Sequence, residues 1–103
     1  MRYERTDSFK RDYGNLSEGE RQAFREAVRE RFLPALEARE RDPGRSWPRE
    51  LRVKGVKGAR GVWELTWSFT DPDGRATWEW TKIEGEPAIR WRRVGSHRIF
   101  EDP

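Results

Sequence analysis

The fold is decided by residues 62–69, which read Val-Trp-Glu-Leu-Thr-Trp-Ser-Phe. Bulky apolar side chains alternate with polar ones along this stretch, the period-two pattern of a strand with one buried face. The set expected to be buried is Trp63, Leu65, Trp67 and Phe69, and the opposite set is Glu64, Thr66 and Ser68. The stretch therefore predicts a strand that presents tryptophan to a core and polar groups to the other side.

Two more strands are expected beyond residue 70. Asp71-Pro72-Asp73-Gly74 is a strong turn signal. After it, Ala76, Trp78 and Trp80 alternate against Arg75, Thr77 and Glu79, and in residues 88–94 Ile89 and Trp91 alternate against Arg90 and Arg92. Three alternating stretches joined by short turns predict an antiparallel meander.

The N-terminal half is expected to be mainly helical. Residues 9–16 carry apolar side chains at helical spacing, and Ser17 with Glu20 matches a capping box at the start of a longer helix. Pro34 falls inside that longer pattern, which predicts either a kink or a helix restart with proline in its first turn. Residues 2–6 are a candidate short first strand, residues 41–48 a loop, and residues 51–61 a basic, glycine-rich lead into the sheet.

Together these elements predict one α+β domain over residues 1–103: two N-terminal helices packed on one face of a small, mainly antiparallel sheet. The helices should cover the tryptophan side. The opposite side of the sheet, called the polar face below, is expected to carry Glu64, Thr66, Arg75, Thr77, Arg90 and Arg92.

Composition narrows the class of protein. The 103 residues are 40% charged and 33% hydrophobic, but six tryptophans and five phenylalanines supply large apolar surfaces for a small core. The chain has one histidine and no cysteine, so we expect no disulfide, no metal site and no cofactor. No apolar run approaches a membrane span, and the first residues lack a signal-peptide core. A soluble, cytoplasmic protein is expected.

The order of motifs resembles the RelE/ParE family of toxins from bacterial toxin–antitoxin pairs. The resemblance covers about residues 9–100 and is carried by the basic stretch 51–58, the Gly-Val-Trp-Glu-Leu of 61–65, and the ending Arg-Val-Gly-Ser-His-Arg-Ile-Phe of 93–100. It implies the same α+β fold, and an antitoxin partner that wraps the toxin and covers its basic face. Many members cleave messenger RNA at the ribosomal A site; others poison DNA gyrase without nuclease chemistry.

In the nuclease branch the RNA 2′-hydroxyl attacks the scissile phosphate, so the implied reaction needs no metal. The resemblance places Arg75 on that phosphate and makes His97 a proton-transfer group, a role that suits histidine because its ordinary pKa of about 6.5 lies near working pH. Glu64 is a candidate proton acceptor, and Glu50 stands near the position of a glutamate base in other members. The residues expected to contact RNA are Arg52, Lys54, Lys57, Arg60, Thr66, Arg90, Arg92 and Trp47.

Some positions depart from the family pattern. Glu64 and Thr66 stand where some members carry lysines, and Phe100 stands where many have a tyrosine. Two alternatives to a ribosome-associated endoribonuclease therefore stay open: a non-enzymatic toxin that binds gyrase, and an inactive binding module of the same fold. Ordinary structural interpretations also remain, with Glu79 neutralising arginines across the sheet and Trp47 either stacking a base or docking an antitoxin.

Overall fold

The computed structural model describes residues 1–69 and 73–103, so residues 71 and 72 of the predicted turn at 71–74 lie outside the described residues. The N-terminal half holds β1 (Arg2–Arg5), α1 (Asp7–Asn15), α2 (Glu18–Ala27), the π-helical η1 (Val28–Phe32), α3 (Leu33–Arg41) and the short 3-10 helix η2 (Arg49–Leu51). The other half holds β2 (Lys54–Gly55), β3 (Val62–Ser68), β4 (Gly74–Ile83), β5 (Glu86–Gly95) and the 3-10 helix η3 (His97–Glu101).

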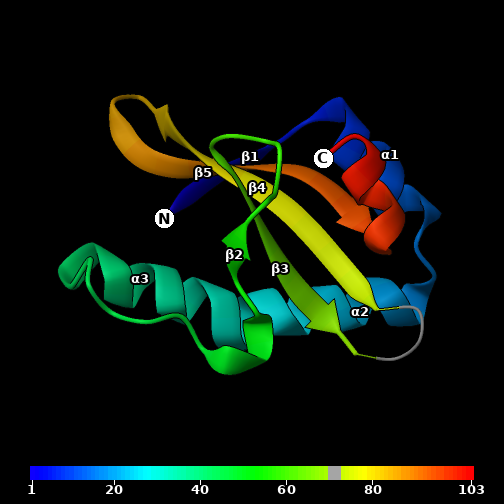
Figure 1. Ribbon diagram of the computed structural model, residues 1–103, viewed down its shortest axis with the longest axis horizontal. Coiled ribbons are helices and arrows are strands. Elements are labelled where there is room, and N and C mark those ends of the chain that lie inside the picture. Colours follow the sequence, from blue (N-terminus) through cyan, green and yellow to red (C-terminus); the bar gives the residue numbers. More distant parts are fainter. Residues whose placement is uncertain (70–72) are drawn as a thin grey trace.

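These strands form one five-stranded sheet in the order β1-β5-β4-β3-β2. The pairs β2–β3, β3–β4 and β4–β5 are antiparallel, which confirms the predicted meander, and β1 joins the far edge parallel to β5. In Figure 1, α2 and α3 run along one side of the sheet, and α1 lies beside η3 at the end of β5. The predicted α+β class is confirmed. No helix within the described ranges is long and apolar enough to span a membrane.

Local sequence signals account for the helix starts. The Thr6 hydroxyl accepts a hydrogen bond from the Phe9 amide at 3.0 Å and caps α1. Ser17 and Glu20 form the predicted capping box at the start of α2, with both reciprocal bonds present. Pro34 lies in the first turn of α3, directly after the π-helical turn, so the predicted restart is the alternative that occurs. Its missing N–H is tolerated at that position.

Aromatic side chains build the core between helices and sheet. Phe24 from α2 packs edge-on against Trp67 and Trp91, and Phe32 packs edge-on against Trp78 at a ring-centroid distance of 5.2 Å. Phe9 from α1 reaches the same cluster through Trp91. The two helical segments therefore bury the tryptophan side of the sheet, as the alternation predicts.

Two of the expected core residues are exposed instead. Phe69 is 52% exposed because β3 ends at Ser68, so the side chain lies beyond the part of the sheet that the helices cover. Trp80 is 42% exposed because it lies near the β4–β5 hairpin, where Trp78 packs edge-on against its ring. The alternation placed both on the apolar side, but their burial was wrongly predicted.

A bulge in β3 holds the strand end next to Arg75. The β3–β4 register shifts between Thr66 and Ser68, which leaves Trp67 as an extra residue. The Trp67 indole N–H donates to the Arg75 carbonyl at 2.8 Å, and its ring lies flat over Gly74. A Cβ at Gly74 would lie 2.5 Å from the Trp67 ring, so only glycine fits there without movement.

A second bulge lies in β5. Ala76 pairs with Val94 but Trp78 pairs with Trp91, so β5 has one more residue than β4 over this stretch. Trp91 and Val94 both stay buried, while Arg92 and Arg93 between them make polar contacts away from the core. The extra residue therefore adds a second arginine beside the polar face.

Candidate functional site

Two groups of charged residues share the polar face, and cross-strand register separates them. Arg90 has a glutamate directly opposite on each neighbouring strand, Glu4 on β1 and Glu79 on β4. Arg75 instead pairs with Thr66 on β3 and Gly95 on β5. We call them the Glu79 cluster (Glu4, Glu79, Arg90 and Arg92) and the Arg75 cluster (Lys54, Glu64, Thr66, Asp73 and Arg75).

The Arg75 cluster gathers around a largely buried guanidinium. The Arg75 side chain is 19% exposed, and its Nη1 lies 3.1 Å from Oε1 of Glu64, whose side chain is 8% exposed. Its Nη2 lies 3.4 Å from an Asp73 oxygen, and the Lys54 ammonium lies 4.0 Å from the same Glu64 oxygen. A buried carboxylate is thus held between two cations, one of them open to solvent.

Hydrogen-bonding capacity remains unused at this cluster. Among the described residues, Nε of Arg75 and the hydroxyl of Thr66 are buried and have no hydrogen-bond partner. Thr66 is 2% exposed and directly opposes Arg75, on the face that the alternation predicts for both. Nε1 of Trp78, on the core side of the sheet, is also unpaired in the described chain. Nε of Arg75 and the Thr66 hydroxyl differ from it because they are neighbours on the polar face, where both are available to a ligand.

The Glu79 cluster is saturated. Arg90 donates to Glu79 at 2.8 Å and to Glu4 at 2.6 Å, and Arg92 donates to the other Glu79 oxygen at 3.1 Å. The hydrogen bond to Glu79, followed by the one to Glu4, raises the pKa of Arg90 above its ordinary value. The interpretation of Glu79 as a group that neutralises arginines across the sheet is confirmed, and both predicted RNA-contacting arginines here already carry carboxylate partners.

The 3-10 helix η3 and the residues that follow it cover the end of the polar face next to Arg75. The Phe100 ring centroid lies 6.0 Å from Cζ of Arg75. The Thr77 hydroxyl donates to the main-chain oxygen of Pro103 at 3.1 Å, and Nε of Arg92 donates to the same oxygen at 3.0 Å. None of these contacts was predicted, because η3 has no periodic sequence signal longer than one turn.

Asp12 of α1 holds the bulged part of β5 through hydrogen bonds. Asp12 accepts two hydrogen bonds from the Arg93 guanidinium, at 2.6 and 3.1 Å, and a third from the Val94 amide at 3.2 Å. The hydrogen bond to Asp12 raises the pKa of Arg93 above its ordinary value. The sequence offered no sign of this pair, since 81 positions separate its members.

Other predicted site residues lie at the rim of the Arg75 cluster or away from it. His97 is the exposed first residue of η3, and no hydrogen bond or ion pair joins it to Arg75 in the part of the chain that the structure describes. Glu50 is exposed in η2. Lys57 and Arg60 are exposed in the turn between β2 and β3.

Arg52 and Trp47 are engaged within the protein. Arg52 adopts a left-handed backbone (φ 46°), and its guanidinium lies 4.9 Å from the Phe69 ring centroid. Trp47 stacks on Phe32 at 5.8 Å and packs edge-on against Trp78. The partly buried Trp47 ring therefore extends the core, so the structure places it in packing contacts.

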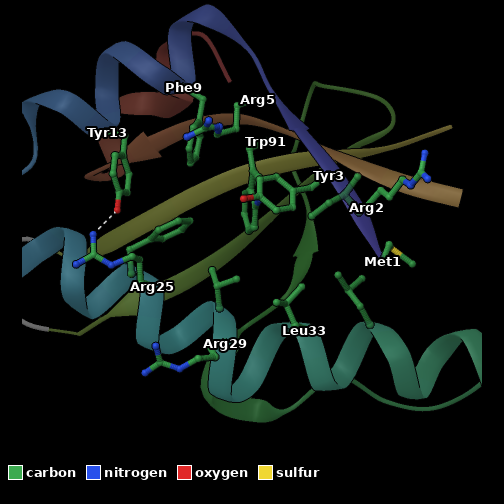
Figure 2. Close-up of a pocket in the computed structure, with 14 residues that line it drawn as sticks. Met1, Arg2, Tyr3, Arg5, Phe9, Tyr13, Arg25, Arg29, Leu33 and Trp91 are labelled. Atoms are coloured by element: carbon green, nitrogen blue, oxygen red, sulfur yellow. Dashed lines mark hydrogen bonds between the residues drawn. The ribbon is translucent and has the colours of Figure 1, made fainter. Parts of the chain in front are cut away.

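The side of the sheet away from the polar face holds an apolar groove of about 390 Å³, between β1, α1 and the α2–α3 segment. Figure 2 shows Phe9, Tyr13, Leu33 and Trp91 facing into it, with the Arg25 guanidinium donating to the Tyr13 hydroxyl at 2.6 Å. That bond is the main cause that raises the pKa of Arg25. The charged residues that line the groove are all arginines: Arg2, Arg5, Arg25 and Arg29.

Comparison with known proteins supports the fold. The structure is similar to a YoeB/ParE toxin from Agrobacterium tumefaciens, with a TM-score of 0.55 and 16% sequence identity, and the match covers 94% of this chain and 99% of that one. No protein-family model and no curated protein sequence matches the chain. At this identity the likeness shows a RelE/ParE-like toxin fold, and what the chain does rests on the site itself.

Proposed function

We propose that this chain is the toxin of a toxin–antitoxin pair and that it cleaves messenger RNA at the Arg75 cluster. The observation that carries the proposal is the partly buried Arg75 guanidinium with a buried, unpaired Nε, next to the unpaired hydroxyl of Thr66 and the buried Glu64 carboxylate. A guanidinium and a hydroxyl can bind phosphate oxygens, and a carboxylate can accept a proton. These are the chemical requirements for RNA cleavage by its own 2′-hydroxyl.

In the proposed reaction Glu64 accepts the proton of the 2′-hydroxyl as the 2′-oxygen attacks the adjacent phosphorus. The bond from phosphorus to the 5′-oxygen breaks, and His97 gives a proton to that leaving oxygen. Arg75 stabilises the negative charge that builds on the phosphate oxygens. The products are a 2′,3′-cyclic phosphate and a free 5′-hydroxyl. Because RNA supplies the nucleophile, the reaction requires no metal ion.

The position of η3 supports the role of His97. This 3-10 helix begins at His97, and its Phe100 contacts the guanidinium of Arg75. His97 is exposed in the same short helix as Phe100, so we infer that its imidazole can reach a substrate bound to Arg75. Glu50, also exposed, is the second candidate for the base, and the carboxylate variants below separate it from Glu64.

The surrounding cations suit a single RNA strand. Lys54, Lys57 and Arg60 are exposed along the lead into β3, and Lys54 is itself a member of the Arg75 cluster. Such cations position a phosphate backbone without reading its sequence. A messenger RNA held in the ribosomal decoding site is the target that the family resemblance favours.

The partner in this proposal is an antitoxin, and the groove of Figure 2 is its docking surface. Its floor is apolar and aromatic, while every charged side chain that lines it is an arginine. Charge complementarity therefore favours an antitoxin segment that presents apolar side chains together with carboxylates. Because this groove lies away from the polar face, such a segment would leave room for further contacts over the basic side.

The test is a translation extract in which message ends are mapped by primer extension, with wild type, His97→Ala and Arg98→Ala. Arg98 is the exposed neighbour of His97 in η3 and serves as the matched control. We expect new ends inside translated codons with wild type and Arg98→Ala, and their loss with His97→Ala. Intact messages with all three proteins would contradict the nuclease proposal.

One observation favours the gyrase-binding alternative. Glu64 neutralises Arg75 in the free protein, and Phe100 brings an aromatic ring without a hydroxyl to the site. Purified gyrase distinguishes the two: inhibition of supercoiling by the wild-type chain, with messages left intact, would support that class. Neither effect would indicate an inactive binding module.

A further inference from the structure

The outer edge of β5 has a strand beside it for only part of its length. In the part of the chain that the structure describes, β1 pairs with β5 as far as Trp91, where the Thr6 amide donates to the Trp91 carbonyl at 3.0 Å. Beyond that point α1 takes the place of the strand, and Figure 1 shows α1 beside η3 at the end of β5. The Thr6 hydroxyl donates to the Arg92 carbonyl at 2.8 Å, and an Asp12 oxygen accepts from the Val94 amide at 3.2 Å. Side chains of α1 thus complete main-chain hydrogen bonds that a strand would otherwise make.

Asp12 also binds the neighbouring guanidinium. Its two oxygens accept from Nε and Nη2 of Arg93 at 2.6 and 3.1 Å, the paired geometry that fixes direction as well as distance. Both side chains are mostly buried, with 16% of Asp12 and 24% of Arg93 exposed. A buried ion pair is weak evidence for stability, because the cost of desolvation offsets the attraction. The geometry that the pair imposes on β5 is therefore the feature to explain.

The residues that this pair holds lead directly into the candidate site. Gly95 pairs with Arg75 on β4, and it lies so close to η3 that a Cβ there would meet a side chain of that helix at 3.2 Å. Beyond η3, Nη1 of Arg93 donates to the main-chain oxygen of Asp102 at 2.9 Å. The ion pair is thus bonded to the chain on both sides of η3, the short helix that begins at His97.

We propose that Asp12 is a positioning residue for RNA cleavage and acts through its bonds to Arg93 and Val94. These bonds set where η3 stands, and thus where His97 meets the 5′-oxygen that leaves the phosphorus. The inference rests on the proposed function, because the step that it concerns is the proton transfer from His97. A displacement of about 1 Å at a reacting group can lower a rate about 100-fold, even when the altered residue lies away from the chemistry. Asp12 can therefore affect cleavage without contact with the RNA.

The test replaces the leaving 5′-oxygen with sulfur in a synthetic message, at the position that the wild type cleaves. A thiol is far more acidic than an alcohol, so the phosphorus–sulfur bond breaks to release a thiolate that needs no proton. The proteins are wild type, His97→Ala, Asp12→Asn and Asp7→Asn, and cleavage of the oxygen and sulfur messages is followed in the translation extract. Asp12→Asn removes the charge and one acceptor oxygen. Asp7, an exposed carboxylate in the first turn of α1, is the matched control.

We expect Asp12→Asn to cleave the oxygen message about 100-fold more slowly than the wild type does, and the sulfur message at nearly the wild-type rate. His97→Ala should show the same recovery with sulfur, and Asp7→Asn should match the wild type on both messages. Thermal unfolding shows whether each variant folds. Arg93→Lys keeps the charge but loses the paired geometry, so it gives the same comparison, with a smaller loss, where Asp12→Asn does not fold.

The outcomes separate this inference from the proposed function. Recovery by His97→Ala without recovery by Asp12→Asn would indicate a general structural role for Asp12 and overturn the inference, while the proposed function would stand. An Asp12→Asn that cleaves the oxygen message as fast as the wild type would do the same. A wild type that cleaves neither message would overturn both.

Discussion

The two charged clusters of the polar face contain the same residue types, but they differ in how many of their hydrogen-bonding groups have partners. In the Glu79 cluster, Arg90 meets a carboxylate on both neighbouring strands. In the Arg75 cluster, the guanidinium is more deeply buried, yet its Nε has no partner among the described residues. Burial without saturation costs stability, so the Arg75 cluster is the part of the sheet where a function explains the arrangement.

The difference lies in what stands opposite each arginine. Glutamates face Arg90 from β1 and β4, whereas a threonine and a glycine face Arg75. Opposite charges in register make Arg90 a structural cross-link between three strands. Neither residue directly opposite Arg75 carries a charge.

The largest effect is expected from exchanging carboxylates for amides. Glu64→Gln keeps the shape of the side chain but removes its ability to accept a proton, so RNA cleavage should fall by about 100- to 10,000-fold. Glu79→Gln, the matched change in the saturated cluster, should alter the rate less than about threefold. Cleavage rates at saturating protein in a translation extract measure both. Equal losses in the two variants would contradict the assignment, and an active Glu64→Gln would turn attention to Glu50.

Gly74→Ala should be the most damaging small substitution for stability. The new Cβ would meet the Trp67 ring at 2.5 Å, so the bulge that adjoins Arg75 must move, at a cost of about 1–3 kcal/mol. Gly55→Ala in β2 is the control, because a Cβ there meets nothing within 4 Å. Denaturant unfolding gives both values, and we expect no more than about 0.5 kcal/mol for the control. Similar losses for the two glycines would show that the Trp67 contact is not limiting.

Thr66→Val should separate binding from stability. The hydroxyl has no partner in the described chain, so its replacement by a methyl group should leave the free energy of unfolding unchanged or raise it by up to about 1 kcal/mol. RNA affinity should fall several-fold because a donor to phosphate is lost. Thr81→Val, whose hydroxyl accepts from Arg90 at 3.4 Å, should leave RNA affinity unchanged. Loss of stability in Thr66→Val without loss of RNA binding would point to a structural hydroxyl.

The smallest effect is expected from Arg90→Gln. The Arg90 side chain is 39% exposed, so loss of its two ion pairs should lower the free energy of unfolding by no more than about 1 kcal/mol. Most of that difference should disappear at about 1 M salt, where the screening length shrinks to about 3 Å. Denaturant unfolding at low and high salt tests this, and a large difference that persists at high salt would indicate a role in packing.

Much of the fold follows from local pattern alone. Alternation assigned the faces of the three long strands, and the capping box at Ser17 and the restart at Pro34 follow from local chemistry. The exposure of Phe69 and Trp80 did not follow, because alternation tells which side a residue faces but not how far the covering helices extend. The parallel edge strand β1 required knowledge of long-range pairing that four residues cannot supply.

The sequence predicts which residues form the candidate site, but it does not predict which of their hydrogen-bonding groups have partners. The alternation placed Arg75, Thr66 and Arg90 on one face, and the structure agrees. Which arginine keeps an unpaired N–H depends on strand register, and the bulges at Trp67 and in β5 change register in ways that composition does not indicate. The bonds of Thr77 and Arg92 to Pro103 depend on η3, a single short helix without periodicity.

The measurement that tests the central claim most directly compares Arg75→Ala with Lys82→Ala in the translation extract, with message ends mapped for both. Lys82 is an exposed cation on the same strand but on the other side of the sheet. Both proteins must first show cooperative thermal unfolding, because Arg75→Ala leaves Glu64 without its nearest cation. We predict that Lys82→Ala cuts messages as the wild type does and that Arg75→Ala produces no new ends. New ends of wild-type intensity with a folded Arg75→Ala would contradict the account.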